Sequence, residues 1–141
     1  MVIGFEVDLV SKVALAAFLG GLIGLEREIH KKPGGLRTHA LVCMGATLFT
    51  VVSFAFTEPT VDSRIAASIV TGIGFLAAGM IIKNGNNIKG YTTAAELWVL
   101  AAIGIAVGVG FYLVAGVTTL LVLLILDPVK WAEGIFSKKK R

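Results

Sequence analysis

Charged residues are scarce in this chain of 141 residues, where Asp, Glu, Lys and Arg together make up only 16%. An average soluble domain carries roughly 25%. Hydrophobic residues make up 56% of the chain, and the mean hydropathy is +0.87. A small domain has too much surface for its volume to hide that much apolar area from water. The composition excludes an ordinary soluble globule, a disordered chain and a nucleic-acid-binding domain, and it predicts an integral membrane protein.

Cysteine and the common catalytic motifs are also missing or rare. Cys43 is the single cysteine, so no disulfide can form within the chain and no Cys/His zinc pattern exists. No GxSxG, Walker A or HExxH spacing occurs. His30 and His39 are separated by a Pro-Gly-Gly break and do not form a metal pair on one helix. We therefore expect no enzyme activity, no cofactor and no metal site.

Five apolar segments follow one another along the chain. Backbone polar groups in hydrocarbon must be paired within their own segment, so these segments are predicted to be helices. Residues 97–126 are too long for one helix without a large tilt, and glycines near 107–110 favour a turn within them. We predict an all-α membrane domain over residues 1–126, a bundle of five transmembrane helices at about 9–25, 38–57, 64–82, 92–107 and 110–126.

The basic residues are distributed unevenly over the predicted loops. With five spans, all of the 13 Lys and Arg residues except Lys12 and Arg64 lie on one side, whereas four spans divide them almost evenly. The positive-inside rule therefore favours five spans, with the N-terminus outside and the C-terminus in the cytoplasm. Residues 127–141 form a basic cytoplasmic tail, which either lies along the anionic inner leaflet or is a solvated tail that only sets topology.

Small residues recur at four-residue spacing in the apolar segments. Such residues let helix backbones approach closely in lipid, where the hydrophobic effect between helices is weak. The pattern predicts a compact bundle but no particular chemistry. The glycines expected at helix contacts are Gly20, Gly24, Gly72, Gly74, Gly79, Gly104 and Gly108.

Polar residues gather at the predicted cytoplasmic ends of the helices. Glu26 follows the first apolar segment directly and is expected to point into the bundle, with His39 as a candidate partner. A plain interfacial role stays open for the neighbouring charges, because charges are routine at helix ends. The candidates for a polar mouth are Glu26, Arg27, Glu28, Arg37, Thr38, His39, Asn87, Thr92, Thr93 and Glu96.

Two features of this region have competing interpretations. The spacing of Thr93 and Glu96 matches a capping box, in which Glu96 would bond back to the backbone at the helix start. Alternatively, Glu96 is an acid that faces the bundle. Residues 83–91 are rich in Asn and Gly, which indicates either a turn or a re-entrant loop that lines a cavity.

Three stretches of the sequence carry a family resemblance. GGLIGLERE (20–28), KPGGLRTHALVCMGATLF (32–49) and residues 64–110, with GIGFLAAG and GNNIKGYTTAAELW, resemble the MgtC/SapB membrane proteins. The resemblance runs in order through residues 14–126. It implies a bacterial inner-membrane bundle of about five spans, and it implies that Asn87 occupies the position of an asparagine that family members need for function.

The resemblance also implies a function. Family members are linked to magnesium homeostasis and virulence, and some bind and inhibit the F-type ATP synthase. Many carry a soluble C-terminal domain that we expect this chain to lack, and Glu96 and Ala77 depart from the family pattern. Virulence is therefore not carried over.

We expect a non-enzymatic regulator that binds a membrane partner such as the F-type ATP synthase or a cation ATPase. Its surroundings are the lipid bilayer, a homodimer is left open, and nucleic acid is not a partner. A magnesium or other cation transporter or channel is the alternative, although the candidate acids all lie at one mouth and no inverted repeat is visible. A third hypothesis is a sensor of pH or of a cytoplasmic ligand that uses His39.

Overall fold

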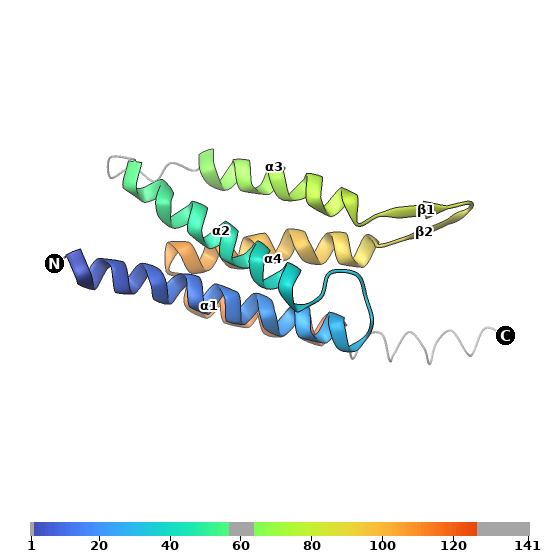
Figure 1. Cartoon of the computed structure of the whole chain (residues 1–141), viewed down its shortest axis with the longest axis horizontal. Coiled ribbons are helices and arrows are strands. Elements are labelled where there is room, and N and C mark those ends of the chain that lie inside the picture. The colour runs from blue at the N-terminus through green and yellow to red at the C-terminus, as the bar shows by residue number, and fades with distance from the viewer. Residues whose placement is uncertain (1, 57–63, 127–141) are drawn as a thin grey trace.

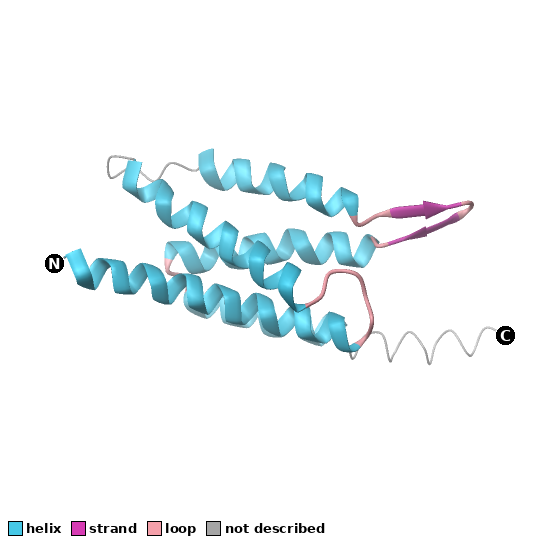
Figure 2. Cartoon of the chain, in the orientation of Figure 1, coloured by secondary structure: helices cyan, strands magenta, loops and turns pink. Residues whose placement is uncertain are grey.

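The structure is a computed structural model that describes residues 2–56 and 64–126. These residues form a bundle of helices and one short β-hairpin (Figures 1 and 2). The helical fold predicted from the sequence is confirmed. The tail 127–141 and the connection 57–63 lie outside the described residues. The elements are α1 (Val2–Ile29), α2 (Leu36–Phe56), α3 (Arg64–Gly79), β1 (Ile82–Asn84), β2 (Asn87–Lys89), α4 (Tyr91–Val109) and α5 (Tyr112–Leu126).

Three of the helices are long and apolar enough to cross a membrane. The qualifying stretches are Glu6–Ile29 in α1, Leu36–Phe54 in α2 and Tyr91–Val109 in α4. The other two helices, α3 and α5, have 16 and 15 residues. At 1.5 Å per residue they extend over about 24 Å, less than the roughly 30 Å of a hydrocarbon core. Five spans and their orientation therefore stay a prediction.

Helix α4 lies at the centre of the bundle and contacts each of the other four helices (Figure 1). Its side chains Leu100, Ile103 and Val107 are almost completely buried. Helix α2 packs closely against both α1 and α4, whereas α3 lies at the edge and packs mainly on α4. Most of the buried core comes from α1, α2 and α4, and Ile73 and Ala77 of α3 and Ala115 and Leu126 of α5 complete it.

Glycines produce the close approach of these three helices. A Cβ on Gly20 of α1 would lie 2.6 Å from the carbonyl oxygen of His39 in α2, and one on Gly104 of α4 would lie 2.5 Å from that of Cys43. Gly24 and Gly108 are equally crowded, against the start of α2 and against Thr50. Since real side chains do not fit into these gaps, α2 is held between glycine faces on both sides.

The glycines of α3 behave differently from the prediction. A Cβ added at Gly72, Gly74 or Gly79 would meet nothing within 4 Å. The expectation that these glycines pack closely on a neighbouring helix was wrong, because α3 lies at the edge of the bundle and Gly72 lines an open groove between α2 and α3.

Buried hydroxyl groups are paired with backbone carbonyl oxygens. Thr47 of α2 donates a hydrogen bond of 2.7 Å to the carbonyl oxygen of Gly104 in α4, next to the glycine contact. Thr50 and Thr119 donate to the carbonyl four residues earlier in their own helices. These bonds satisfy the hydroxyls inside the bundle and add a direct link between α2 and α4.

The segment between α3 and α4 is a hairpin rather than a re-entrant loop. Strands β1 and β2 pair antiparallel with Asn84 opposite Asn87, and all their residues are exposed. The hairpin extends beyond the helices at the end where α4 begins (Figure 1). This geometry agrees with the interpretation of the segment as a turn, and residues of the hairpin also line cavities at this end of the bundle.

Candidate functional site: a buried charge cluster at one end of the bundle

The last turns of α1 and the first turns of α2 and α4 meet at the end of the bundle that carries the hairpin (Figure 1). Glu26 and Arg27 of α1, His39 of α2 and Glu96 of α4 are buried there, with exposed fractions of 8%, 5%, 0% and 6%. Charged groups are almost never buried to this degree unless they are paired. We refer to these four residues as the charge cluster.

Arg27 lies between the two acids. Its Nε is 3.2 Å from Glu96 Oε1, and its Nη1 is 3.3 Å from Glu26 Oε2. The first contact joins α1 to α4 across the bundle, so one guanidinium contacts carboxylates from two helices. This bridging role places Arg27 at the centre of the cluster.

Both histidines lie beside the acids. Nδ1 of His30 is 3.0 Å from Glu26 Oε1 and 2.9 Å from the Glu26 carbonyl oxygen. Nε2 of His39 is 3.9 Å from Glu96 Oε1, and its Nδ1 lies 3.2 Å from the carbonyl oxygen of Gly35. The expected partnership between His39 and Glu26 was thus assigned to the wrong acid, because α2 turns the ring toward α4.

Several buried polar atoms of the cluster have ion-pair contacts but no well-aligned hydrogen bond among the described residues. They are Glu26 Oε1, Arg27 Nε, His39 Nε2 and both carboxylate oxygens of Glu96. A buried polar group without such a bond costs about 1–3 kcal/mol. The cluster therefore retains capacity to accept hydrogen bonds, from water or from a positively charged ligand.

The structure corrects the capping-box interpretation of Glu96. Helix α4 begins at Tyr91, and its N-cap is Gly90, in the left-handed conformation with φ of 98°. Thr93 therefore lies inside the helix, and no side chain caps the helix start. With its carboxylate on Arg27, Glu96 is the bundle-facing acid.

The remaining candidates from the sequence do not join the cluster. Glu28 is exposed, and its Oε2 accepts a hydrogen bond of 3.1 Å from the backbone N–H of Leu36, which ties α1 to the start of α2. Arg37 and Thr38 are exposed on the first turn of α2, and Asn87 is exposed on the hairpin. Thr92 and Thr93 line a neighbouring cavity, together with three lysines that the sequence alone did not single out.

The cluster does not have the composition of a metal site. Within residues 2–56 and 64–126, no three His, Cys, Asp or Glu side chains are placed to hold a metal ion. Arg27 occupies the position between the two acids that a cation would need.

These features define a class of protein: a membrane-embedded helical bundle with a buried arginine–carboxylate cluster at one end. The chain belongs to the MgtC family, whose sequence pattern matches residues 13–135. The family predicted from the sequence motifs is thereby confirmed.

Several curated relatives are similar to this chain. It is 46% identical over 127 residues to the Putative magnesium transporter YhiD of Escherichia coli K12. The aligned region covers 82% of this chain and 59% of that relative. It is 45% identical to Protein MgtC of Brucella abortus, with 80% and 48% covered. It is 47% identical to Protein MgtC of Salmonella typhimurium LT2, with 77% and 46% covered. The chain spans about half the length of these relatives, and no solved structure gives a significant match.

Proposed function

We propose that this chain is a multi-pass protein of the bacterial inner membrane, with its N-terminus outside, and that it serves magnesium homeostasis by binding another membrane protein. Membership of the MgtC family and the name of the relative YhiD support the link to magnesium. The partner we propose is an ion-translocating ATPase, either the F-type ATP synthase or a cation ATPase. To bind the membrane-embedded part of such a partner, the chain needs a docking surface within the bilayer.

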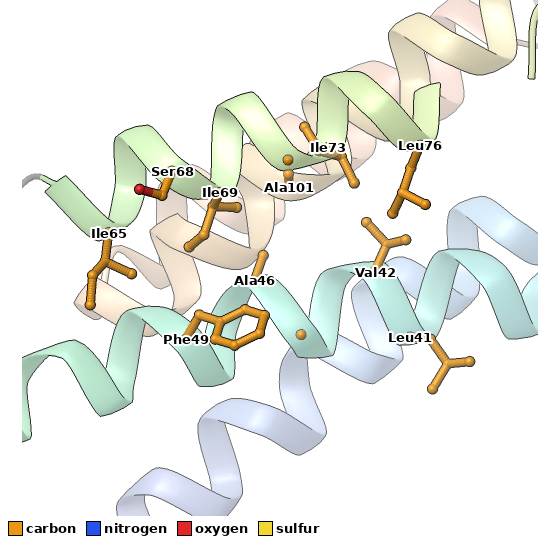
Figure 3. Close-up of a pocket in the computed structure, with 12 residues that line it drawn as sticks. Leu41, Val42, Ala46, Phe49, Ile65, Ser68, Ile69, Ile73, Leu76 and Ala101 are labelled. Carbon is orange, nitrogen blue, oxygen red and sulfur yellow. The ribbon is translucent and has the colours of Figure 1, made fainter. Parts of the chain in front are cut away.

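The observation that carries this proposal is a lateral groove between α2 and α3, with a volume of about 630 Å³ (Figure 3). It is lined by large apolar side chains, including Phe49 and Leu76, and by the small residues Gly45, Ala46 and Gly72. Small residues let a second helix approach closely in lipid. The groove thus offers a transmembrane helix of the partner both a close approach and apolar contact.

The tight interior of the bundle supports binding over conduction. Crowded glycine contacts close the space between α1, α2 and α4, as at Gly20 and Gly104. The two buried acids, Glu26 and Glu96, are already engaged by Arg27. A path for a hydrated cation along these helices would require both sets of contacts to open.

The test compares two glycines of the same helix. Gly72 lines the groove and Gly74 does not, and both are exposed positions where a Cβ meets nothing within 4 Å. Tagged full-length variants Gly72→Leu and Gly74→Leu would be expressed at native level and purified from native membranes. We expect the wild type and Gly74→Leu to bring down the ATPase, and Gly72→Leu to lose most of it. Equal recovery from both variants, or no membrane partner with the wild type, contradicts the proposal.

Transport of magnesium or another cation is the second candidate. The observation in its favour is that both carboxylate oxygens of Glu96 and one of Glu26 lack aligned hydrogen bonds although they are buried. Acids inside a membrane domain often mark ion pathways. Liposomes that contain the purified chain would show saturable magnesium uptake, abolished by Glu96→Gln, if this candidate holds. Uptake no greater than that of empty liposomes contradicts it.

A further inference from the structure

A second cavity, of about 780 Å³, opens at the charge-cluster end of the bundle. It lies between the loop after α1, the end of β2, the start of α4 and the end of α5. We call it the basic cavity. Its lining residues are Arg27, Lys31, Lys32, Pro33, Lys89, Gly90, Thr92, Thr93, Ile125 and Leu126.

The turn that ends α1 presents two of these lysines. The backbone N–H of Lys32 donates to the carbonyl oxygen of Arg27 at 2.9 Å, and that of Lys31 donates to Glu28 at 3.1 Å. This pair of bonds is the Schellman motif, which needs a left-handed residue at the position of Lys31. Lys31 has φ of 52°, in the region that glycine usually supplies. The turn fixes Lys31 and Lys32 at the rim of the basic cavity.

The positive charge of the cavity comes from its lysines. Lys31, Lys32 and Lys89 form no ion pair with any acid in the part of the chain that the structure describes. Arg27 adds no net positive charge, because its single guanidinium lies against two carboxylates, those of Glu26 and Glu96. Three ammonium groups that have no ion pair among residues 2–56 and 64–126 surround one concave site, where they attract a multiply charged anion.

The floor of the cavity supplies hydrogen-bond donors. Helix α4 starts there without a side-chain cap, and its first backbone bond runs from Ala94 N to the Gly90 carbonyl oxygen. The N–H groups of the preceding residues are therefore open to a ligand, and the helix dipole favours negative charge at this point. Thr93, which lines the cavity and is only 3% exposed, makes no side-chain hydrogen bond within the described residues.

One wall of the cavity is apolar. It consists of Ile125, which is 61% exposed, and Leu126, both at the end of α5. A phospholipid matches both sides of this cavity. Its headgroup fits the side with hydrogen-bond donors and cations, and the first part of its acyl chain fits the outward apolar wall. A soluble phosphate would use only the polar side.

We propose that the basic cavity binds the phosphoryl group of an anionic membrane lipid, with the lysines on the phosphate oxygens and the acyl chain along Ile125. The site is separate from the α2–α3 groove, so its test does not depend on the proposed docking of a membrane partner. Lipid bound here would bridge α1, the hairpin, α4 and α5, and it would stabilise the bundle by mass action.

The hairpin provides a matched pair of variants. Lys83 and Lys89 lie on its two strands, both exposed, but only Lys89 lines the basic cavity. The full chain, purified in neutral detergent, would be unfolded by heat after addition of phosphatidylglycerol, phosphatidylcholine or inorganic phosphate. Native mass spectrometry would count the retained lipid. The variants are Lys89→Gln, Lys83→Gln and the double variant Lys32→Gln/Lys89→Gln.

We expect phosphatidylglycerol to raise the Tm by several degrees and phosphatidylcholine to leave it unchanged. Lys83→Gln should keep this rise in Tm, and Lys89→Gln should lose most of it. The double variant should show no rise in Tm and should retain no lipid in native mass spectrometry. The Tm in detergent alone should be the same for all variants, because the lysines are exposed. An equal rise with phosphatidylcholine, or an undiminished rise in the double variant, overturns the site. A rise that inorganic phosphate reproduces in full overturns the lipid assignment.

Discussion

Arg27 is the residue on which the charge cluster depends. It is 5% exposed and holds Glu26 and Glu96 together. Removing one partner of a buried ion pair leaves uncompensated charge and costs about 3–5 kcal/mol. We therefore expect Arg27→Met to lower the free energy of unfolding in detergent by about this amount. Arg37→Met, at an exposed arginine of the adjoining helix, should change it by less than about 0.5 kcal/mol.

A double variant separates the pairing from the packing of the arginine side chain. Arg27→Met/Glu96→Leu removes the stranded acid, so it should recover part of the loss, while Glu26 keeps His30 as a partner. If Arg27→Met costs no more than Arg37→Met, the cluster does not hold the helix ends together.

Lys31 adopts a backbone conformation that suits glycine better than lysine. With φ of 52°, the lysine backbone carries a steric cost of about 1–2 kcal/mol that glycine would avoid. Glycine loses part of this advantage because its unfolded chain is more flexible. We expect Lys31→Gly to stabilise the protein by about 1 kcal/mol relative to Lys31→Ala, which removes the same charge without relieving the backbone. Thermal or denaturant unfolding of the two variants in detergent measures this difference. Equal stabilities would show that the backbone at this position is not strained.

At the scale of helices, α2 and α4 approach closely at Gly104. Gly104 allows it, since a Cβ would lie 2.5 Å from the Cys43 carbonyl oxygen, which is backbone and cannot move alone. We expect Gly104→Ala to destabilise the protein by about 1–3 kcal/mol through overpacking. Gly116→Ala on α5, where a Cβ meets nothing within 4 Å, should be neutral or slightly stabilising because alanine favours helix. Similar unfolding curves for the two variants would contradict the glycine contact.

The sequence pattern predicted some of these helix contacts correctly and others wrongly. Four-residue spacing of small residues pointed equally to Gly20, Gly104 and Gly72, yet an added Cβ at Gly72 would meet nothing within 4 Å. Spacing gives a face of a helix but not its neighbour. The same limit applies to the site: adjacency of Glu26 and Arg27 was visible, but their convergence with Glu96 depends on how α4 is rotated and where it starts. Gly90, before Tyr91, was the signal for that start, and the Thr93 capping pattern obscured it.

At the scale of the whole molecule, the end of α5 is found together with the hairpin and the end of α1. Leu126 lines the same cavity as Arg27 and Lys89, while the start of α1 lies at the opposite end of the bundle (Figure 1). This arrangement is the one that five passes through a membrane produce, even though α3 and α5 are short. Combined with the basic residues at the hairpin end, it leads us to expect that end in the cytoplasm.

Cysteine labelling tests this orientation with little background, because the native Cys43 is completely buried. Single cysteines would replace Glu6, exposed near the start of α1, and Asn86, exposed at the hairpin turn. In intact spheroplasts, a membrane-impermeant maleimide should label the cysteine at position 6 and spare the one at 86 until the membrane is permeabilised. The reverse labelling pattern would show the opposite orientation, with the charge cluster and the basic cavity outside. Labelling of both sites from outside would contradict a bundle that crosses the bilayer along its helices.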